Sequence, residues 1–282
     1  MEHNTDDLAC ALISLLRGEP ADVLDWQSFR SLVIRHGVVG LVYPLINSEE
    51  GKSALFRDYA DQASNTIAHM ALFSFLRENA PPFLAMKGAS LIARGLYLPQ
   101  ERPLLDMDIL VRPRDIPLFV KILSASGFSE VISSRKGVVL HRGRINIDLH
   151  LYPVARELFI PPGKLWARSS EGFLSPEDEL LVISVHEAKS SFTFGPRLIW
   201  KQDAERLLTL VDLEKALWLA RSVGLESCLT RFLRARDIDI VRGKRNPGRF
   251  RKLSLAWRAG ANKGQKFLCV SAAAWERIGR GR

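Results

Sequence analysis

Residues 105–111 read LDMDILV, and the fold class depends on this stretch. Polar and apolar side chains alternate and then give way to an apolar run, a pattern that indicates a strand. In a strand, side chains two residues apart project from one face, so Asp106 and Asp108 are expected side by side, about 7 Å apart. Two such carboxylates repel each other, and a divalent cation bound between them removes that repulsion. The alternative is a solvated pair of acids at a strand end.

A second stretch, INIDLHL at residues 145–151, has the same alternation. Asp148 and His150 share one face of the predicted strand. If this strand lies beside the first, Asp148 joins Asp106 and Asp108 at one metal site. Three acids on adjacent strands are what two-metal phosphoryl or nucleotidyl transfer needs, with Mg²⁺ or Mn²⁺ bound. His150 either orients that site or is a hydrogen-bonded histidine of the sheet.

Helical periodicity covers the first 80 residues. Asp25 is a predicted N-cap, and Gly37 is the predicted C-terminal stop of the same helix. A longer amphipathic stretch runs over residues 53–78. The prolines at 81–82 end it, because proline lacks the N–H donor and disfavours a helical residue before it.

Residues 81–155 combine strand and helix patterns. The expected elements, in chain order, are an apolar run at 83–86, a turn at Lys87-Gly88, a helix at 89–97, a strand at 104–111, a helix from Pro113 to Gly127, and a hairpin of strands at 138–141 and 145–151.

Helical patterns return at Ser175, a predicted N-cap that is followed by a proline and by acids in the first turn. They continue to about Arg221. The sequence therefore predicts an α/β (α+β) chain with a helical cap before a small mixed core. Its expected parts are a helical N-terminal part at 1–80, an α/β core at 81–155, a helical C-terminal part at 156–225 and a basic C-terminal extension at 226–282.

The net charge of +9 is concentrated at the C-terminal end. Residues 231–282 hold 15 Lys and Arg against three acidic residues, a net +12, whereas the rest holds 25 basic and 28 acidic residues, a net −3. Such asymmetry favours an anionic partner, which could be RNA, an acidic peptide, a phosphorylated molecule or a membrane surface. The alternative is a solvated basic tail.

Three cysteines, Cys10, Cys228 and Cys269, are too few and too far apart for a disulfide framework, which indicates a reducing compartment. The acidic N-terminus does not resemble a signal peptide, and no apolar run approaches the roughly 20 residues of a membrane span. We therefore expect a cytoplasmic protein.

Taken together, the motifs resemble those of the uncharacterised bacterial nucleotidyltransferase family, within the polymerase-β-like superfamily. The resemblance rests on the Lys-Gly turn in residues 83–89, the Arg-x-x-x-Asp-x-Asp motif at residues 102–108 and the Asp-x-His motif at residues 148–150. It extends over about residues 20–215. Trp26, His36, His186 and Asp203 also belong to it.

The resemblance implies a nucleotidyltransferase-like mixed sheet, flanked by helices, that binds Mg²⁺ and a nucleoside triphosphate such as ATP at its acidic edge. Asp106 and Asp108 would be the metal pair and Asp148 the third acid. The superfamily holds the triphosphate with a Gly-Ser turn, whereas this chain has Lys87-Gly88-Ala89-Ser90. Gly88 still admits close backbone approach, and either Lys87 or Ser90 would contact phosphate.

Three further residues have two interpretations each. Arg102 either neutralises phosphate charge or pairs with an acid. His186 and Asp203 either support the site or form a structural contact between neighbouring helices.

The expected reaction is transfer of a nucleotidyl group from a nucleoside triphosphate to a hydroxyl or phosphate acceptor. Transfer of a phosphoryl or glycosyl unit at the same acids is an alternative. A non-catalytic module that binds nucleic acid or peptide on this fold is another.

Overall fold

A computed structural model describes residues 2–134, 136–153, 160–191 and 195–242. The N-terminal part is helical, as predicted. Its elements are α1 (Glu2–Leu16), α2 (Trp26–His36), α3 (Val39–Val42), a 3₁₀ turn η1 (Tyr43–Leu45) and α4 (Glu49–Asn79). The predicted ends of α2 are confirmed: the Ser28 N–H donates to Asp25 Oδ1 at 2.9 Å, and Gly37 is left-handed at φ 69°. Glycine adopts that conformation without steric cost.

The centre of the chain is a five-stranded mixed sheet, which confirms the predicted fold class. The strands lie in the order β1-β2-β5-β4-β3. Strand β2 is parallel to β5, and the other neighbours are antiparallel. The strands are β1 (Leu84–Ala85), β2 (Met107–Leu110), β3 (Ser129–Ser134), β4 (Gly137–Arg142) and β5 (Ile145–His150).

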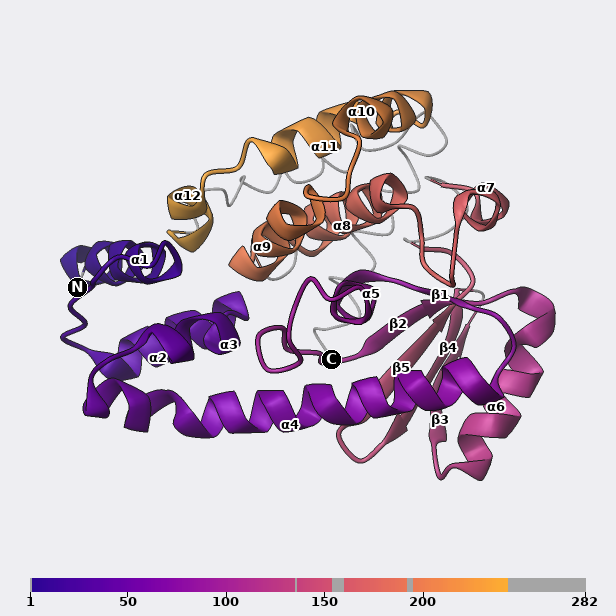
Figure 1. Cartoon of the computed structure of the whole chain (residues 1–282), viewed down its shortest axis with the longest axis horizontal. Coiled ribbons are helices and arrows are strands. Elements are labelled where there is room, and N and C mark those ends of the chain that lie inside the picture. The colour runs from indigo at the N-terminus through magenta and orange to yellow at the C-terminus, as the bar shows by residue number, and fades with distance from the viewer. Residues whose placement is uncertain (1, 135, 154–159, 192–194, 243–282) are drawn as a thin grey trace.

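The sheet is covered by helices from several parts of the chain (Figure 1). The long α4 contacts β5, and the short α5 contacts β2. The N-terminal α1 packs against the last described helix, so segments far apart in sequence lie side by side. The remaining helices are α5 (Lys87–Ala93), the 3₁₀ turn η2 (Pro113–Asp115), α6 (Ile116–Ala125), α7 (Pro162–Arg168), α8 (Pro176–Ser191), α9 (Leu198–Leu207), α10 (Leu213–Ser222), α11 (Glu226–Leu233) and α12 (Asp237–Val241).

The strand predicted from residue 104 begins only at Met107, because side chains of α4 make hydrogen bonds to the backbone before it. The Asn65 amide donates to the Leu104 carbonyl at 2.7 Å, and the Leu104 N–H donates to Thr66 Oγ1 at 3.0 Å. The Thr66 hydroxyl in turn donates to the Arg102 carbonyl at 3.3 Å. These groups are therefore satisfied without a neighbouring strand.

The predicted Lys87-Gly88 turn is wrong, because both residues open α5. The helix also ends at Ala93 and not at residue 97. Its first N–H, on Lys87, donates at 2.5 Å to Oε1 of Glu179, a carboxylate from the distant α8. A partner 92 residues away in the sequence cannot be recognised from local capping patterns.

Strand β3 was not predicted, since it gives no periodic signal. All of its side chains are exposed, and its pairing with β4 is irregular between Glu130 and Ile132. The predicted cap at Ser175 is confirmed, with the Asp178 N–H donating to Ser175 Oγ at 3.2 Å.

Buried apolar side chains from the N-terminal helices, the sheet and the C-terminal helices form one continuous core. None of the helices in the described ranges combines the length and apolar character needed to cross a bilayer. Most of the predicted basic extension, residues 243–282, lies outside the described residues.

The hydrogen bonds between α4 and the loop before β2 can be tested with Thr66→Val. The substitution keeps the shape but leaves the buried Leu104 N–H without an acceptor, and an unsatisfied buried donor costs about 1–3 kcal/mol. Urea unfolding should show a loss of that size. Thr230→Val is the control, because the Thr230 hydroxyl only donates to the Glu226 carbonyl one turn earlier in α11. Equal losses in the two variants would contradict the proposed role of Thr66.

Candidate active site

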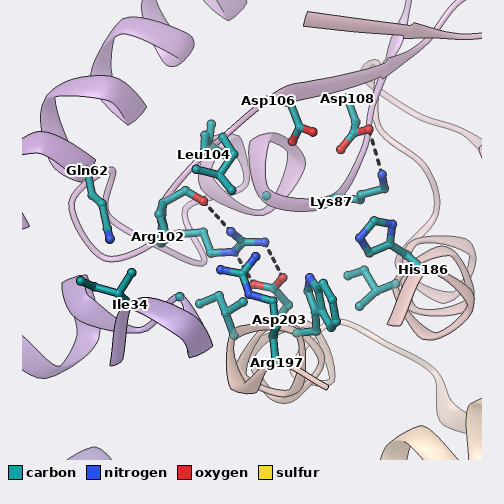
Figure 2. Close-up of a pocket in the computed structure, with 17 residues that line it drawn as sticks. Ile34, Gln62, Lys87, Arg102, Leu104, Asp106, Asp108, His186, Arg197 and Asp203 are labelled. Atoms are coloured by element: carbon teal, nitrogen blue, oxygen red, sulfur yellow. Dashed lines mark hydrogen bonds and ion pairs between the residues drawn. The ribbon is translucent and has the colours of Figure 1, made fainter. Parts of the chain in front are cut away.

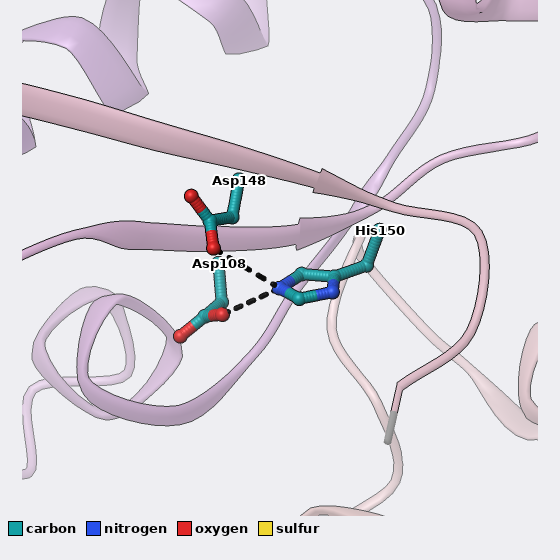
Figure 3. A group of neighbouring side chains, drawn as sticks. All are labelled: Asp108, Asp148 and His150. Carbon is teal, nitrogen blue, oxygen red and sulfur yellow. Dashed lines mark hydrogen bonds and ion pairs between the residues drawn. The ribbon is translucent and has the colours of Figure 1, made fainter. Parts of the chain in front are cut away.

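The parallel pairing of β2 with β5 sets Asp108 directly opposite Asp148. His150, two residues further along β5, places its Nε2 atom 2.6 Å from Asp108 Oδ1 and 3.9 Å from Asp148 Oδ2 (Figure 3). Lys87, at the start of α5, donates from Nζ to the same Asp108 oxygen at 2.8 Å. Two carboxylates, an imidazole and an ammonium therefore meet where two strands and a helix converge.

Burial and mutual charge give these acids different pKa values. Burial would raise the pKa of Asp108, but Lys87 and His150 lower it well below its usual range. The charge of Asp108 is the main cause that raises the pKa of Asp106 to about 6. Burial and the same charge also raise the pKa of Asp148. Asp108 therefore stays ionised, whereas Asp106 and Asp148 bind a proton more readily than ordinary aspartates.

The donor atoms of Asp108, Asp148 and His150 lie within 4.8 Å of one another, close enough to hold one metal ion. Their chemistry fits a divalent cation, because two carboxylate oxygens and an imidazole nitrogen are ordinary ligands. A cation would also relieve the repulsion that raises the pKa of Asp148. Two of the three predicted acids thus meet, and His150 completes the group. Asp106 lies just before β2, with an exposed side chain.

The predicted phosphate-contact residues are separated by the fold. Lys87 faces the acids, whereas Ser90 is fully buried and accepts a hydrogen bond from Arg94 Nε at 3.3 Å. A Cβ on Gly88 would stand 2.6 Å from Leu104 Cδ2 and 3.3 Å from Arg102 Cζ. The missing side chain of Gly88 therefore lets the loop before β2 pack directly on α5.

Arg102 pairs with an acid, one of the two interpretations of the sequence. Its Nε and one terminal nitrogen donate to the two oxygens of Asp203, each at 2.8 Å. The other terminal nitrogen donates to the Pro103 carbonyl at 2.6 Å. Both side chains are buried, so this bidentate pair fixes the loop before β2 to α9.

A cavity of about 280 Å³ opens beside the acids (Figure 2). Its walls come from the loop before β2, from α5 and from helices on either side. The lining residues are Ile34, Gly37, Gln62, Lys87, Gly88, Arg102, Pro103, Leu104, Leu105, Asp106, Asp108, Ile183, His186, Arg197, Ile199, Trp200 and Asp203. Acids predicted from strand periodicity therefore border an enclosed space that a small molecule can enter.

His186 and Asp203 both line this cavity, from α8 and α9. The His186 ring packs edge-on against Trp200, with centroids 5.3 Å apart, and its Nε2 lies 3.4 Å from Ser190 Oγ. The carboxylate of Asp203 is engaged by Arg102. His186 and Asp203 thus line the same cavity, but each contacts a different partner and the two are not bonded to each other in the interactions described above.

Sequence reasoning missed Glu179 and Arg197. Glu179 belongs to a run of acids that was interpreted only as favourable charge in the first turn of α8. Arg197 directly precedes α9 and carries no motif. Trp200 in α9 is 7% exposed and also lines the cavity.

Comparison with protein families assigns the chain to a known family. Residues 22–236 match a family described as uncharacterised nucleotidyltransferase. The chain belongs to this family. Comparison with curated proteins and with solved structures gives no match.

The nucleotidyltransferase match confirms the resemblance predicted from the Lys-Gly, Asp-x-Asp and Asp-x-His motifs. It extends beyond the predicted limit of about residue 215 and takes in α11. The matched span contains the whole sheet and every residue that lines the cavity.

The buried Glu179 should make the stability of the protein depend on pH. Its Oε2 lacks a hydrogen-bond partner among the described residues, and burial raises its pKa to about 7. The folded protein therefore keeps a proton that the unfolded chain releases near pH 4.5, so a rise in pH between these values destabilises the fold. Glu179→Gln should gain stability relative to wild type over that interval, by at most about 3 kcal/mol at about 1.4 kcal/mol per pKa unit.

Urea unfolding at a series of pH values measures this difference. The matched control is Glu78→Gln, because Glu78 is exposed near the end of α4. A difference between Glu179→Gln and wild type that stays constant from pH 4.5 to 7 would show that Glu179 is ionised throughout.

Proposed function

We propose that this chain is a Mg²⁺-dependent nucleotidyltransferase that moves a nucleotidyl group from a nucleoside triphosphate to a hydroxyl or phosphate acceptor. The observation that carries the proposal is the register that sets Asp108 opposite Asp148, with Lys87 bonded to Asp108 and both of these residues lining the cavity. The family match supports the same class of reaction.

Asp108 and Asp148 would hold the metal, with His150 and Asp106 beside them. Mg²⁺ favours oxygen ligands and substrate phosphates, whereas the imidazole also admits Mn²⁺. When bound, the cation neutralises phosphate charge and polarises the reacting phosphorus. Asp108 is suited to permanent binding because its low pKa keeps it ionised.

The chain's own residues would position the substrates. The Lys87 ammonium would supply positive charge next to the phosphates. Gly88 lets the loop that carries Asp106 pack directly on the start of α5. An acceptor oxygen attacks the α-phosphorus while the bond to the β-phosphate oxygen breaks and pyrophosphate leaves. Asp148 would take the proton from the acceptor hydroxyl, since its carboxylate lies directly opposite Asp108 on the neighbouring strand.

The position of the label in the triphosphate separates this reaction from phosphoryl transfer. Incubation with α-labelled triphosphate should label the acceptor, whereas γ-labelled triphosphate should release labelled pyrophosphate only. Labelling of the acceptor by the γ-phosphate would replace nucleotidyl transfer with phosphoryl transfer. Contact between the basic C-terminal extension and an anionic acceptor stays a prediction, since residues 243–282 are outside the described ranges.

Asp108→Asn and Asp106→Asn should each abolish transfer while the protein stays folded. Removing one preorganised charge from a reaction centre lowers turnover by a factor on the order of 10²–10³. The stabilisation of the protein by Mg²⁺ with a triphosphate, measured as a rise in Tm, should disappear in Asp108→Asn. Asp115→Asn is the control, since Asp115 lies in η2, outside the cavity. Near-normal turnover in Asp108→Asn would refute the metal assignment, and near-normal turnover in Asp106→Asn would remove Asp106 from the reaction centre.

Asp148→Asn should lower kcat more than it lowers triphosphate affinity, because its proposed part is to receive the acceptor proton. Steady-state kinetics gives kcat, and titration of the triphosphate in the presence of Mg²⁺ gives the affinity. Equal losses in the two quantities would make Asp148 a nucleotide-holding residue instead.

A further inference from the structure

Arg197 is the residue just before α9, and its side chain lines the cavity (Figure 2). Its Nε donates to the Arg35 carbonyl at 3.1 Å, and its guanidinium lies over the Trp200 ring, 5.7 Å from the centroid. These contacts orient the side chain and leave its terminal nitrogens available to a ligand, because a guanidinium carries five N–H donors.

Arg197 differs from the other cations of the cavity wall in its pairing. Lys87 is paired with Asp108, and Arg102 with Asp203. No carboxylate in the described ranges lies within ion-pair distance of Arg197. Burial and then the charge of Arg102 lower the pKa of Arg197, the charges of Asp203 and Asp106 partly offset this, and the guanidinium remains protonated at neutral pH. The neighbouring Asp203 carboxylate is already bound by Arg102, so Arg197 lines the cavity without an ion pair of its own in the described ranges.

The backbone around Arg197 is shaped to admit its guanidinium. A Cβ on Gly37 would lie 2.6 Å from the Arg197 terminal nitrogen Nη2 and 3.2 Å from Ile199 Cγ2, so glycine gives the guanidinium room at this position. Gly37 is also the left-handed end of α2. Nearby, burial and then the charges of Arg35 and Arg197 lower the pKa of His36 to about 4. Local potential is thus positive at this end of the cavity.

The rest of the wall is largely apolar, and it leads from Arg197 to the acids. Leu104, Ile183 and Ile199 are among its apolar lining residues. In Figure 2, Arg197 lies on the α9 side of the cavity, and Asp106 and Asp108 lie on the opposite side. A ligand with an anionic group at Arg197 and an apolar body would reach towards the acids.

We infer that this cavity binds the acceptor, a small organic molecule whose carboxylate or phosphate group is held by Arg197. This inference rests on the proposed function, because only that reaction makes the bound molecule an acceptor. The volume of about 280 Å³ is close to the lower limit of small-molecule sites, so it fits one compact molecule or one end of a larger one. The triphosphate would take the opposite end, where Lys87 and the metal ligands lie.

Direct binding of simple anions tests the inference without Mg²⁺ or triphosphate. The probes are phenylacetate and phenyl phosphate, with phenylacetamide as the neutral match, measured by calorimetric titration and by Tm. At least one anion should bind wild type more tightly than the amide. Arg197→Gln should weaken that anion about tenfold or more, and Arg197→Lys should weaken it less, because lysine keeps the charge but loses the fork geometry.

Arg35→Gln is the matched control. Arg35 is an exposed arginine close to Arg197. The substitution removes its charge but keeps its backbone carbonyl, which accepts the hydrogen bond from Arg197 Nε. Affinity in this variant should stay within about twofold of wild type, since screened surface charges contribute little. Preference for one probe identifies the anionic group as carboxylate or phosphate.

Two outcomes would overturn the inference. Equal binding of anions and amide, or an anion affinity unchanged in Arg197→Gln, would mean that Arg197 does not bind an anion. Competitive displacement of the probe by Mg²⁺ with a triphosphate would assign Arg197 to the nucleotide. Because the probes bind without metal or nucleotide, an absence of transfer activity alone would refute the proposed function and leave this anion site standing.

Discussion

The buried ion pair between Arg102 and Asp203 determines how the two halves of the site meet. It joins the loop that carries Asp106 to α9, and the other terminal nitrogen of the guanidinium donates to the Pro103 carbonyl. Loss of one partner from such a pair leaves an uncompensated buried charge, which costs about 3–5 kcal/mol. The pair therefore stabilises a specific spacing between the sheet edge and the C-terminal helices, and that spacing is the cavity.

The charged side chains around this pair differ between the two ends of the cavity. Asp108 is buried with Lys87 and His150 as partners, whereas Asp106 is exposed and shares their influence at longer range. At the other end of the cavity, Arg197 has positive neighbours and no paired acid in the described ranges. A site with a strongly anionic end and a cationic end can orient a ligand that has unlike ends, because reversal would place like charges together.

Periodicity in the sequence was sufficient for elements whose signals are local. Alternation predicted β5 and the face that Asp148 shares with His150, and the residues Asp25 and Gly37 marked both ends of α2. It could not predict contacts made across long separations. Thr66 shortens β2 by binding the backbone of the preceding loop, and Glu179 begins α5 by accepting the Lys87 N–H. Arg197 belongs to no motif, and only the packing of α9 against α2 and α5 brings it to the cavity.

The two margins of the sheet have a consequence for how the molecule behaves among its own copies. An open strand margin is a template on which another chain can add a strand. On one side β1 is only two residues long, and the Ala85 N–H already donates to the Gly172 carbonyl at 2.9 Å. On the other, β3 exposes Val131 and Ile132, but its irregular register between Glu130 and Ile132 interrupts the regular ladder. Sheet extension, the first step of strand-mediated aggregation, is thus obstructed at both margins.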